Sequence, residues 1–155
     1  MKFAYYKTDF DPDKTFIEIG YERDFIKSIK LLDGISHKDE KSKISDQCFK
    51  ELEEYFKGKR KKFTVKFKAQ GTEFQEKCWK ELLKIPYGQT KTYGQIAEEI
   101  KNPKAARAVG NANNKNPLWI IIPCHRVLGK NGSLTGYAGG LKIKEKLLKL
   151  EKENL

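Results

Sequence analysis

The chain has 155 residues, which suits one domain or two small lobes and excludes a large multidomain enzyme. Its 32 Lys and Arg exceed its 21 Asp and Glu, giving a formal net charge of +11, and its 38% apolar residues can bury a core, which excludes intrinsic disorder. No apolar run approaches the ~20 residues that cross a bilayer, and the acidic N-terminal stretch lacks the features of a signal peptide, so a cytoplasmic protein with no membrane partner is expected.

The first 70 residues predict a small α/β lobe. Residues 3–6 and 15–21 are rich in aromatic and β-branched side chains, which favours two strands. Apolar residues at helical spacing predict a helix from Ser45 to Phe56. Residues 59–67 then predict a further strand.

Capping signatures mark the helices of the second half. A Thr followed three residues later by Gln predicts helices over 72–85 and from 92 to about 100. Asn102 is a good N-cap for another helix over 103–113, because Pro follows it in the first turn. Two short helices joined by two or three residues are typical of a helix-turn-helix, whose second helix meets DNA.

The charge pattern of this region favours an anionic partner. No acidic residue lies between Glu99 and Glu145, whereas basic residues recur throughout the interval. DNA fits the helix pair better than a membrane does. The second helix, PKAARAVGNANN, is rich in small residues around Arg107, a pattern suited to close approach and to insertion of one cation into a base stack or minor groove. Its alternative is that the alanines pack against another helix.

A candidate nucleophile follows the apolar run LWIIIP, which predicts a strand. The chain has three cysteines without CxxC spacing, so neither a disulfide framework nor a zinc cluster is indicated. Cys124 alone would most simply be an inert buried thiol. However, His125 can accept its proton, and Arg126 and the surrounding cations favour the thiolate, which is the reactive form of the side chain.

These residues resemble the O6-alkylguanine-DNA alkyltransferases, also called methylated-DNA–protein-cysteine methyltransferases. The similarity covers residues 71–151 and rests on PCHRV around the cysteine, on KAARAVGNANNKNP before it and on GYAGG after it. Residues 1–70 match only in general character. The resemblance implies a small, variable N-terminal α/β lobe (1–70) and a mostly helical domain (71–155) that contains the helix-turn-helix, binds DNA and accepts the alkyl group.

The activity that the resemblance implies is direct DNA repair in a single turnover. Such a protein flips O6-alkylguanine, chiefly O6-methylguanine, out of double-stranded DNA and transfers the alkyl group irreversibly to its own cysteine. It is expected to act as a monomer without a cofactor or a metal. The zinc site in the N-terminal lobe of some members has no counterpart in this sequence.

The resemblance also implies roles for individual residues. Cys124 is the alkyl acceptor, His125 is the base that reaches it through a water, and Glu151 orients that histidine. Tyr93 eases rotation of the base and helps the guanine to leave, and Asn116 ties the turn before the active-site strand. Arg107 fills the space that the flipped base leaves. The expected DNA contacts are Arg107, Lys104, Ala106, Tyr93, Lys115 and Arg126.

The expected guanine pocket consists of Trp119, Val127, Tyr137, Ala138 and Gly139. The backbone carbonyls of Cys124 and Val127 are expected to accept hydrogen bonds from the exocyclic amine of the guanine. Ala138 stands where some members have serine, so a hydroxyl contact to O6 is missing. Trp119 stands where others have proline, which predicts a narrower pocket and slow reaction with bulky adducts such as O6-benzylguanine.

Three other functions are compatible with parts of the pattern. A damage-recognition relative would bind alkylated bases but would lack the acceptor cysteine. A transcription regulator would use the same helix pair, although its second helix lacks the cluster of Asn, Gln and Arg that usually reads bases. A Cys–His hydrolase would need an oxyanion hole and an acyl substrate, and nothing else in the sequence indicates either.

Overall fold

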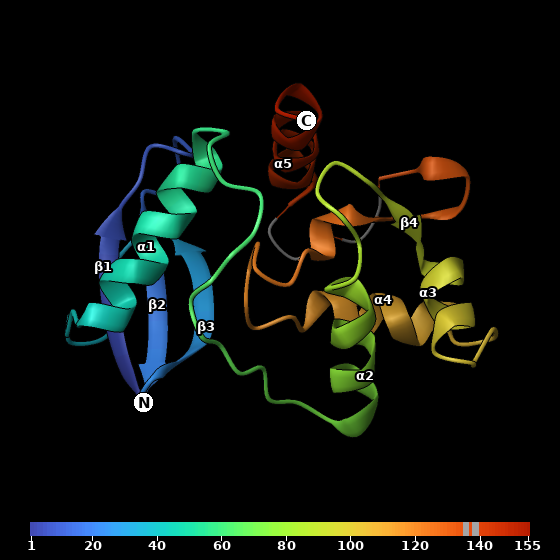
Figure 1. Cartoon of the computed structure of the whole chain (residues 1–155), viewed down its shortest axis with the longest axis horizontal. Coiled ribbons are helices and arrows are strands. Elements are labelled where there is room, and N and C mark those ends of the chain that lie inside the picture. The colour runs from blue at the N-terminus through green and yellow to red at the C-terminus, as the bar shows by residue number, and fades with distance from the viewer. Residues whose placement is uncertain (135–136, 138–139) are drawn as a thin grey trace. The chain divides into compact units, whose positions relative to one another are not determined.

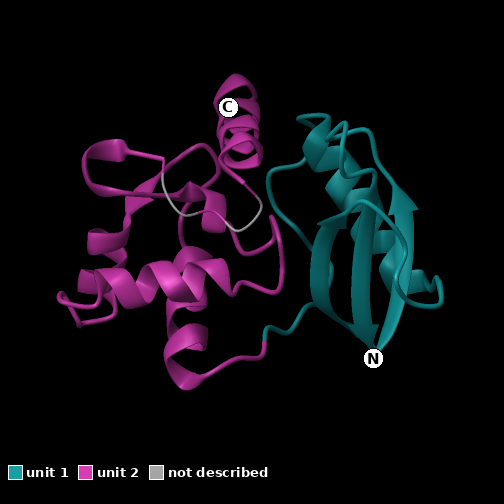
Figure 2. Ribbon diagram, turned by 180° about the vertical axis from the view of Figure 1, so that it is seen from behind, with its two compact units in different colours: residues 1–69 teal, residues 70–155 magenta. Residues whose placement is uncertain are grey.

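The computed structural model describes residues 1–134, 137 and 140–155. The chain forms two compact units, Met1–Ala69 and Gln70–Leu155 (Figures 1 and 2). A small antiparallel sheet and one helix make up the first unit, and helices dominate the second. The predicted class, an α/β lobe followed by a mostly helical domain, is confirmed.

The first unit is a three-stranded sheet covered by one helix. Its elements are β1 (Lys2–Lys7), β2 (Phe16–Glu22), β3 (Phe25–Leu32) and α1 (Lys43–Phe56). The strands pair antiparallel in the order β1-β2-β3, and α1 packs against β2 and β3. Ile17 and Ile19 of the central strand and Leu52 of the helix have no exposed surface, so the core lies between the sheet and α1.

The prediction of a strand over residues 59–67 is wrong. The third strand is β3, whereas residues 59–67 form no regular strand and touch the sheet only at an isolated bridge between Ile26 and Phe67. The reason is the buried Glu51 carboxylate of α1, which accepts hydrogen bonds from the backbone amides of Thr64 and Val65 at 2.7 and 3.2 Å. A helix side chain therefore satisfies the amides that a strand would pair.

The second unit is built from helices linked by short turns. Its elements are α2 (Glu73–Leu82), β4 (Lys91–Thr92), α3 (Tyr93–Glu99), α4 (Ala106–Asn114), the 3₁₀ helix η1 (Cys124–Arg126), β5 (Val127–Leu128), the 3₁₀ helix η2 (Lys130–Gly132) and α5 (Leu141–Glu153). The predicted capping boxes are present at the start of α2 and of α3. The pair α3 and α4 forms the helix-turn-helix. No helix in the described part of the chain is long and apolar enough to cross a membrane.

The connection within the helix-turn-helix is longer than the sequence suggests. Asn102 does not cap α4. Its backbone amide instead donates to Ala97 O at 2.9 Å while the amide of Lys101, at φ 62°, donates to Glu98 O at 2.9 Å. This pair of hydrogen bonds is the Schellman arrangement that ends a helix. Asn102 therefore belongs to the C-terminal end of α3. The second helix starts only at Ala106.

The predicted strand before the cysteine is a buried turn. Ile122 N donates to Leu118 O at 3.0 Å, and Cys124 N donates to Ile122 O at 2.7 Å, so the chain folds back on itself instead of extending. Ile120 within the turn has a φ of 72°, a left-handed conformation that is rare for a β-branched residue. The apolar side chains of the run are buried as expected, but in a turn and not in a sheet.

Candidate active site around Cys124

A short parallel strand pair sets the backbone of the site. Lys91 of β4 pairs with Val127 of β5, and Thr92 pairs with Leu128. Because Tyr93 follows β4 directly and η1 precedes β5 directly, this pairing places the start of α3 beside the cysteine-bearing turn. Segments that lie far apart in the sequence thus meet at Cys124.

Two asparagines fix the cysteine, one in the last turn of α4 and one just after that helix. Asn116 Nδ2 donates to Ile122 O at 2.8 Å and lies 3.2 Å from Cys124 Sγ, and its Oδ1 accepts from Leu118 N at 2.9 Å. The buried Asn113 donates from Nδ2 to Cys124 O at 3.1 Å. Asn116 was expected at this turn from the sequence. Asn113 was missed, because an asparagine inside a helix pattern gives no signal of what it bonds.

The sulfur is held as a thiol at rest. Cys124 is 5% exposed, and burial raises the pKa of its thiol above the ordinary value, although hydrogen bonds from Asn116 and Tyr137 and the charge of Lys144 act in the opposite direction. Lys144, one of the basic residues expected around the cysteine, is therefore a cation that favours the thiolate. A base is needed to make the thiol nucleophilic.

His125 and Glu151 form a buried pair. His125 Nε2 lies 2.6 Å from Glu151 Oε2, and both side chains are almost completely inaccessible. Burial lowers the pKa of His125, the contact with Glu151 raises it, and Arg126 and Lys144 lower it, with a net decrease. A neutral imidazole next to the thiol can act as a general base.

Arg126 is part of this buried network. Its Nε donates to Glu151 Oε1 at 2.8 Å, its Nη2 donates to Oε2 at 3.0 Å, and its Nη1 donates to Ile85 O at 2.8 Å. Only 8% of the residue is exposed. This burial contradicts the expectation that Arg126 contacts DNA, since its donors already face protein acceptors.

Three of the residues expected to line the guanine pocket are described, namely Trp119, Val127 and Tyr137. The indole Nε1 of Trp119 donates to Tyr137 Oη at 2.9 Å, and both side chains are 9% exposed. Val127 O accepts from Lys144 Nζ at 2.6 Å. A carbonyl oxygen has two lone pairs, so Val127 O can still accept a second donor. The two remaining expected pocket residues, Ala138 and Gly139, lie outside the described residues.

Lys144 is a second residue, after Asn113, whose burial in the site sequence reasoning missed. Its side chain is fully buried, and its Nζ lies 5.8 Å from the ring centroids of both Tyr93 and Tyr137. Burial lowers the pKa of this amine. A signal was available, because Lys144 and Glu151 are seven residues apart and therefore share the inward face of α5.

The helix α4 turns one face inward and one outward. Val109 and Ala112 are buried, and Trp79 Nε1 donates to Ala112 O at 2.9 Å. Arg107 lies on the exposed face. A Cβ at Gly110 would lie 3.9 Å from the Tyr93 ring, an ordinary van der Waals distance, so the tyrosine lies beside α4 at this position. Of the other expected DNA contacts, Lys104 and Lys115 are exposed, and Ala106 and Tyr93 are partly exposed.

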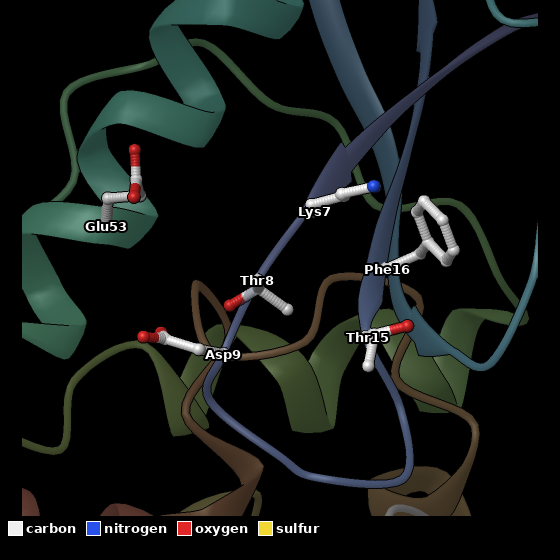
Figure 3. A pocket seen from close by; sticks show the side chains of 6 residues that line it. All are labelled: Lys7, Thr8, Asp9, Thr15, Phe16 and Glu53. Atoms are coloured by element: carbon white, nitrogen blue, oxygen red, sulfur yellow. The ribbon is translucent and has the colours of Figure 1, made fainter.

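The first unit holds a separate hollow with different chemistry. It is lined by Lys7, Thr8, Asp9, Thr15, Phe16 and Glu53 (Figure 3). Its charges are of mixed sign, and its lining contains no cysteine or histidine.

Comparisons with known proteins agree with the geometry. The family model for the 6-O-methylguanine DNA methyltransferase DNA-binding domain matches residues 73–153, and the model for the ribonuclease-like domain of the same proteins matches residues 12–69. A methylated-DNA–protein-cysteine methyltransferase of Methanosarcina mazei is 60% identical over 123 residues, which are 79% of this chain and 75% of the relative.

Solved structures show the same fold. The Mycobacterium tuberculosis protein crystallised in complex with DNA superposes with a TM-score of 0.88 and 38% identity over 98% of this chain and 93% of that one. An O6-methylguanine DNA methyltransferase from Methanococcus jannaschii gives a TM-score of 0.74 and 27% identity over 98% and 95% of the two chains. The chain therefore belongs to the family of methylated-DNA–protein-cysteine methyltransferases.

Proposed function

We propose that this protein repairs O6-alkylguanine, chiefly O6-methylguanine, in double-stranded DNA by moving the alkyl group onto Cys124. Because the chain belongs to this family, its activity is DNA repair by alkyl transfer. The observation that carries the assignment of the acceptor is the environment of Cys124, a buried thiol held by Asn116 next to the buried pair of His125 and Glu151. The other two cysteines, Cys48 and Cys78, are buried in helices α1 and α2.

The proposed reaction is one displacement. His125 takes the thiol proton through a water, and Glu151 stabilises the imidazolium that forms. The sulfur attacks the alkyl carbon, the S–C bond forms, and the C–O6 bond breaks with its electron pair passing to the guanine ring. The guanine takes up one proton, which balances the proton that the thiol loses. Because the thioether that results is stable, each molecule reacts once.

The proposed DNA surface is the exposed face of α4 with Tyr93. Arg107 stands on that face among small residues, which suits insertion into the space of a flipped base. Flipping costs a few kcal/mol, so a side chain that occupies the gap favours the extrahelical state. The relative from M. tuberculosis was crystallised with DNA, which supports a DNA-binding role for the shared fold.

We also propose that the protein acts as a monomer in the cytoplasm and uses no cofactor. One copy of the chain supplies both the sulfur and the helix that faces DNA. Its three cysteines are free thiols, which suits a reducing compartment.

The mass of the intact protein tests the proposal. After incubation with a duplex that contains one O6-methylguanine, the protein is expected to gain about 14 Da, the mass of one CH₂, in a 1:1 ratio with the lesion. Peptide mapping should place the gain on Cys124. A duplex with unmodified guanine is the control. No gain, with binding to the lesion retained, would identify a damage-recognition protein instead.

Trp119 should limit the size of the alkyl group. Its indole is held by Tyr137 and is nearly buried, so it cannot swing away without losing a hydrogen bond. We expect O6-benzylguanine to inactivate the wild-type protein much more slowly than O6-methylguanine in DNA does, and Trp119→Pro to reduce that difference. Inactivation rates with both substrates measure this, and equal rates in the wild type would disprove a narrowed pocket.

A further inference from the structure

The carboxylate of Glu151 is the centre of a buried hydrogen-bond network. It accepts from Arg126 Nε and Nη2 and from the backbone amide of Gly88 at 3.0 Å, and it pairs with His125 Nε2. Each oxygen therefore has two partners, which fixes the plane of the carboxylate. The imidazole is oriented by a group that is itself oriented by other donors.

Arg126 supplies half of the donors in this network and ties it to a third segment. A third hydrogen bond, from Nη1, reaches Ile85 O at 2.8 Å in the turn that follows α2. The guanidinium carbon lies 5.6 Å from the centroid of the Tyr87 ring. A planar guanidinium that grips a carboxylate with two parallel bonds fixes its orientation far better than an ammonium group can.

The charges around His125 explain why a cation is needed at this place. Glu151 and Lys144 face it from α5, Arg126 is its neighbour in η1, and the titratable Cys124 and Tyr87 lie beside this network. A buried carboxylate alone would favour the imidazolium form, which cannot accept a proton from the thiol. The guanidinium neutralises the carboxylate, and the positive charge of Arg126 lowers the pKa of His125.

We propose that Arg126 is a positioning residue for alkyl transfer, which acts through Glu151 to keep His125 neutral and correctly oriented. The proposal rests on the assigned role of His125 as the base. It gives this arginine a task in the chemistry instead of a contact with the DNA. The residue touches neither substrate nor sulfur in this role.

Single-turnover rates as a function of pH test the proposal, with Arg126→Gln as the main variant. We expect transfer to slow at least ~10-fold and at most ~10⁴-fold, the upper range for a general base. Loss of the cation raises the pKa of His125, so the acid limb of the pH profile should move to higher pH. The affinity for unmodified duplex should stay at the wild-type value.

Three further variants separate this role from others. Arg107→Ala should weaken DNA binding and leave the acid limb in place, which is the opposite pattern. Lys80→Gln removes one exposed charge from α2 and should change neither property. Arg126→Lys keeps the positive charge but loses the pair of hydrogen bonds to Glu151. It should therefore keep the acid limb of the wild type, with a lower rate of transfer. This variant also serves if Arg126→Gln does not fold.

Nitrogen chemical shifts of His125 give a readout that a merely structural role would not change. We expect a neutral ring with the proton on Nε2 in the wild type at pH 7, and protonation at higher pH in Arg126→Gln than in the wild type. A folded Arg126→Gln protein with a wild-type rate, acid limb and His125 spectrum would overturn the proposal, as would a slower variant whose acid limb and spectrum are unchanged. Failure of the wild type to gain mass would instead refute the proposed function itself.

Discussion

A Cys124→Ala variant is expected to gain no mass from a duplex that contains O6-methylguanine, while it still binds that duplex. The methyl group needs a soft nucleophile, and alanine leaves none at the end of the relay from Glu151 through His125. The contacts of α4 and Tyr93 that we assign to DNA do not involve the sulfur, so affinity should be retained. Intact-mass spectrometry and a binding titration with the same duplex measure the two properties.

Cys78→Ala is the matched control for this variant. Cys78 is 1% exposed in α2, and burial raises the pKa of its thiol to about 11. A thiol in this state is unreactive. The control should gain about 14 Da as the wild type does, by the same CH₂ transfer. A full gain in Cys124→Ala, or its loss in Cys78→Ala, would show that the acceptor has been assigned to the wrong cysteine.

The second large effect is expected for Glu151→Ala, which should destabilise the fold and stop most of the chemistry. Removal of the carboxylate leaves the buried cation of Arg126 without its counter-charge and the Gly88 amide without its acceptor. Breaking a buried ion pair from one side costs about 3–5 kcal/mol. Loss of the group that orients His125 should slow transfer by ~10²-fold or more. Urea unfolding and single-turnover rates measure these two losses.

Glu145→Ala controls for the loss of a carboxylate from the same helix. Glu145 is exposed on α5, so this change should alter the free energy of unfolding by less than about 0.5 kcal/mol. Glu151→Gln keeps the size of the side chain and should fall between the two in stability. A Glu151→Ala protein as stable as the Glu145→Ala variant would show that the network contributes little to the fold.

Local signals in the sequence predicted much of the architecture. The capping boxes at Thr72 and Thr92 gave the starts of α2 and α3, because a cap depends only on residues three positions apart. Strands β1 and β2 followed from their aromatic and β-branched side chains, and helix α1 followed from helical spacing. Cys124 and His125 were found because a nucleophile and its base are adjacent in the sequence, whereas the roles of Asn116 and Glu151 followed only from the resemblance to the family.

Long-range partners explain what the sequence did not predict. The run before Cys124 has the composition of a strand, but Asn116 closes it into a turn through side-chain bonds that no apolar pattern reveals. The basic character of Arg126 favoured DNA, whereas its acceptors are Glu151 and Ile85, both distant in the chain. Residues 59–67 do not form the predicted strand, because the carboxylate of Glu51 in α1 binds backbone amides of this segment.

The burial of Cys124 has a consequence for the working life of the protein. A molecule that reacts once must not be used up by soluble oxidants and electrophiles, which attack thiolates in preference to thiols. With 5% exposure and a pKa raised by burial, the resting sulfur presents little thiolate to such compounds. Burial thus protects the acceptor sulfur from these side reactions until the protein binds damaged DNA.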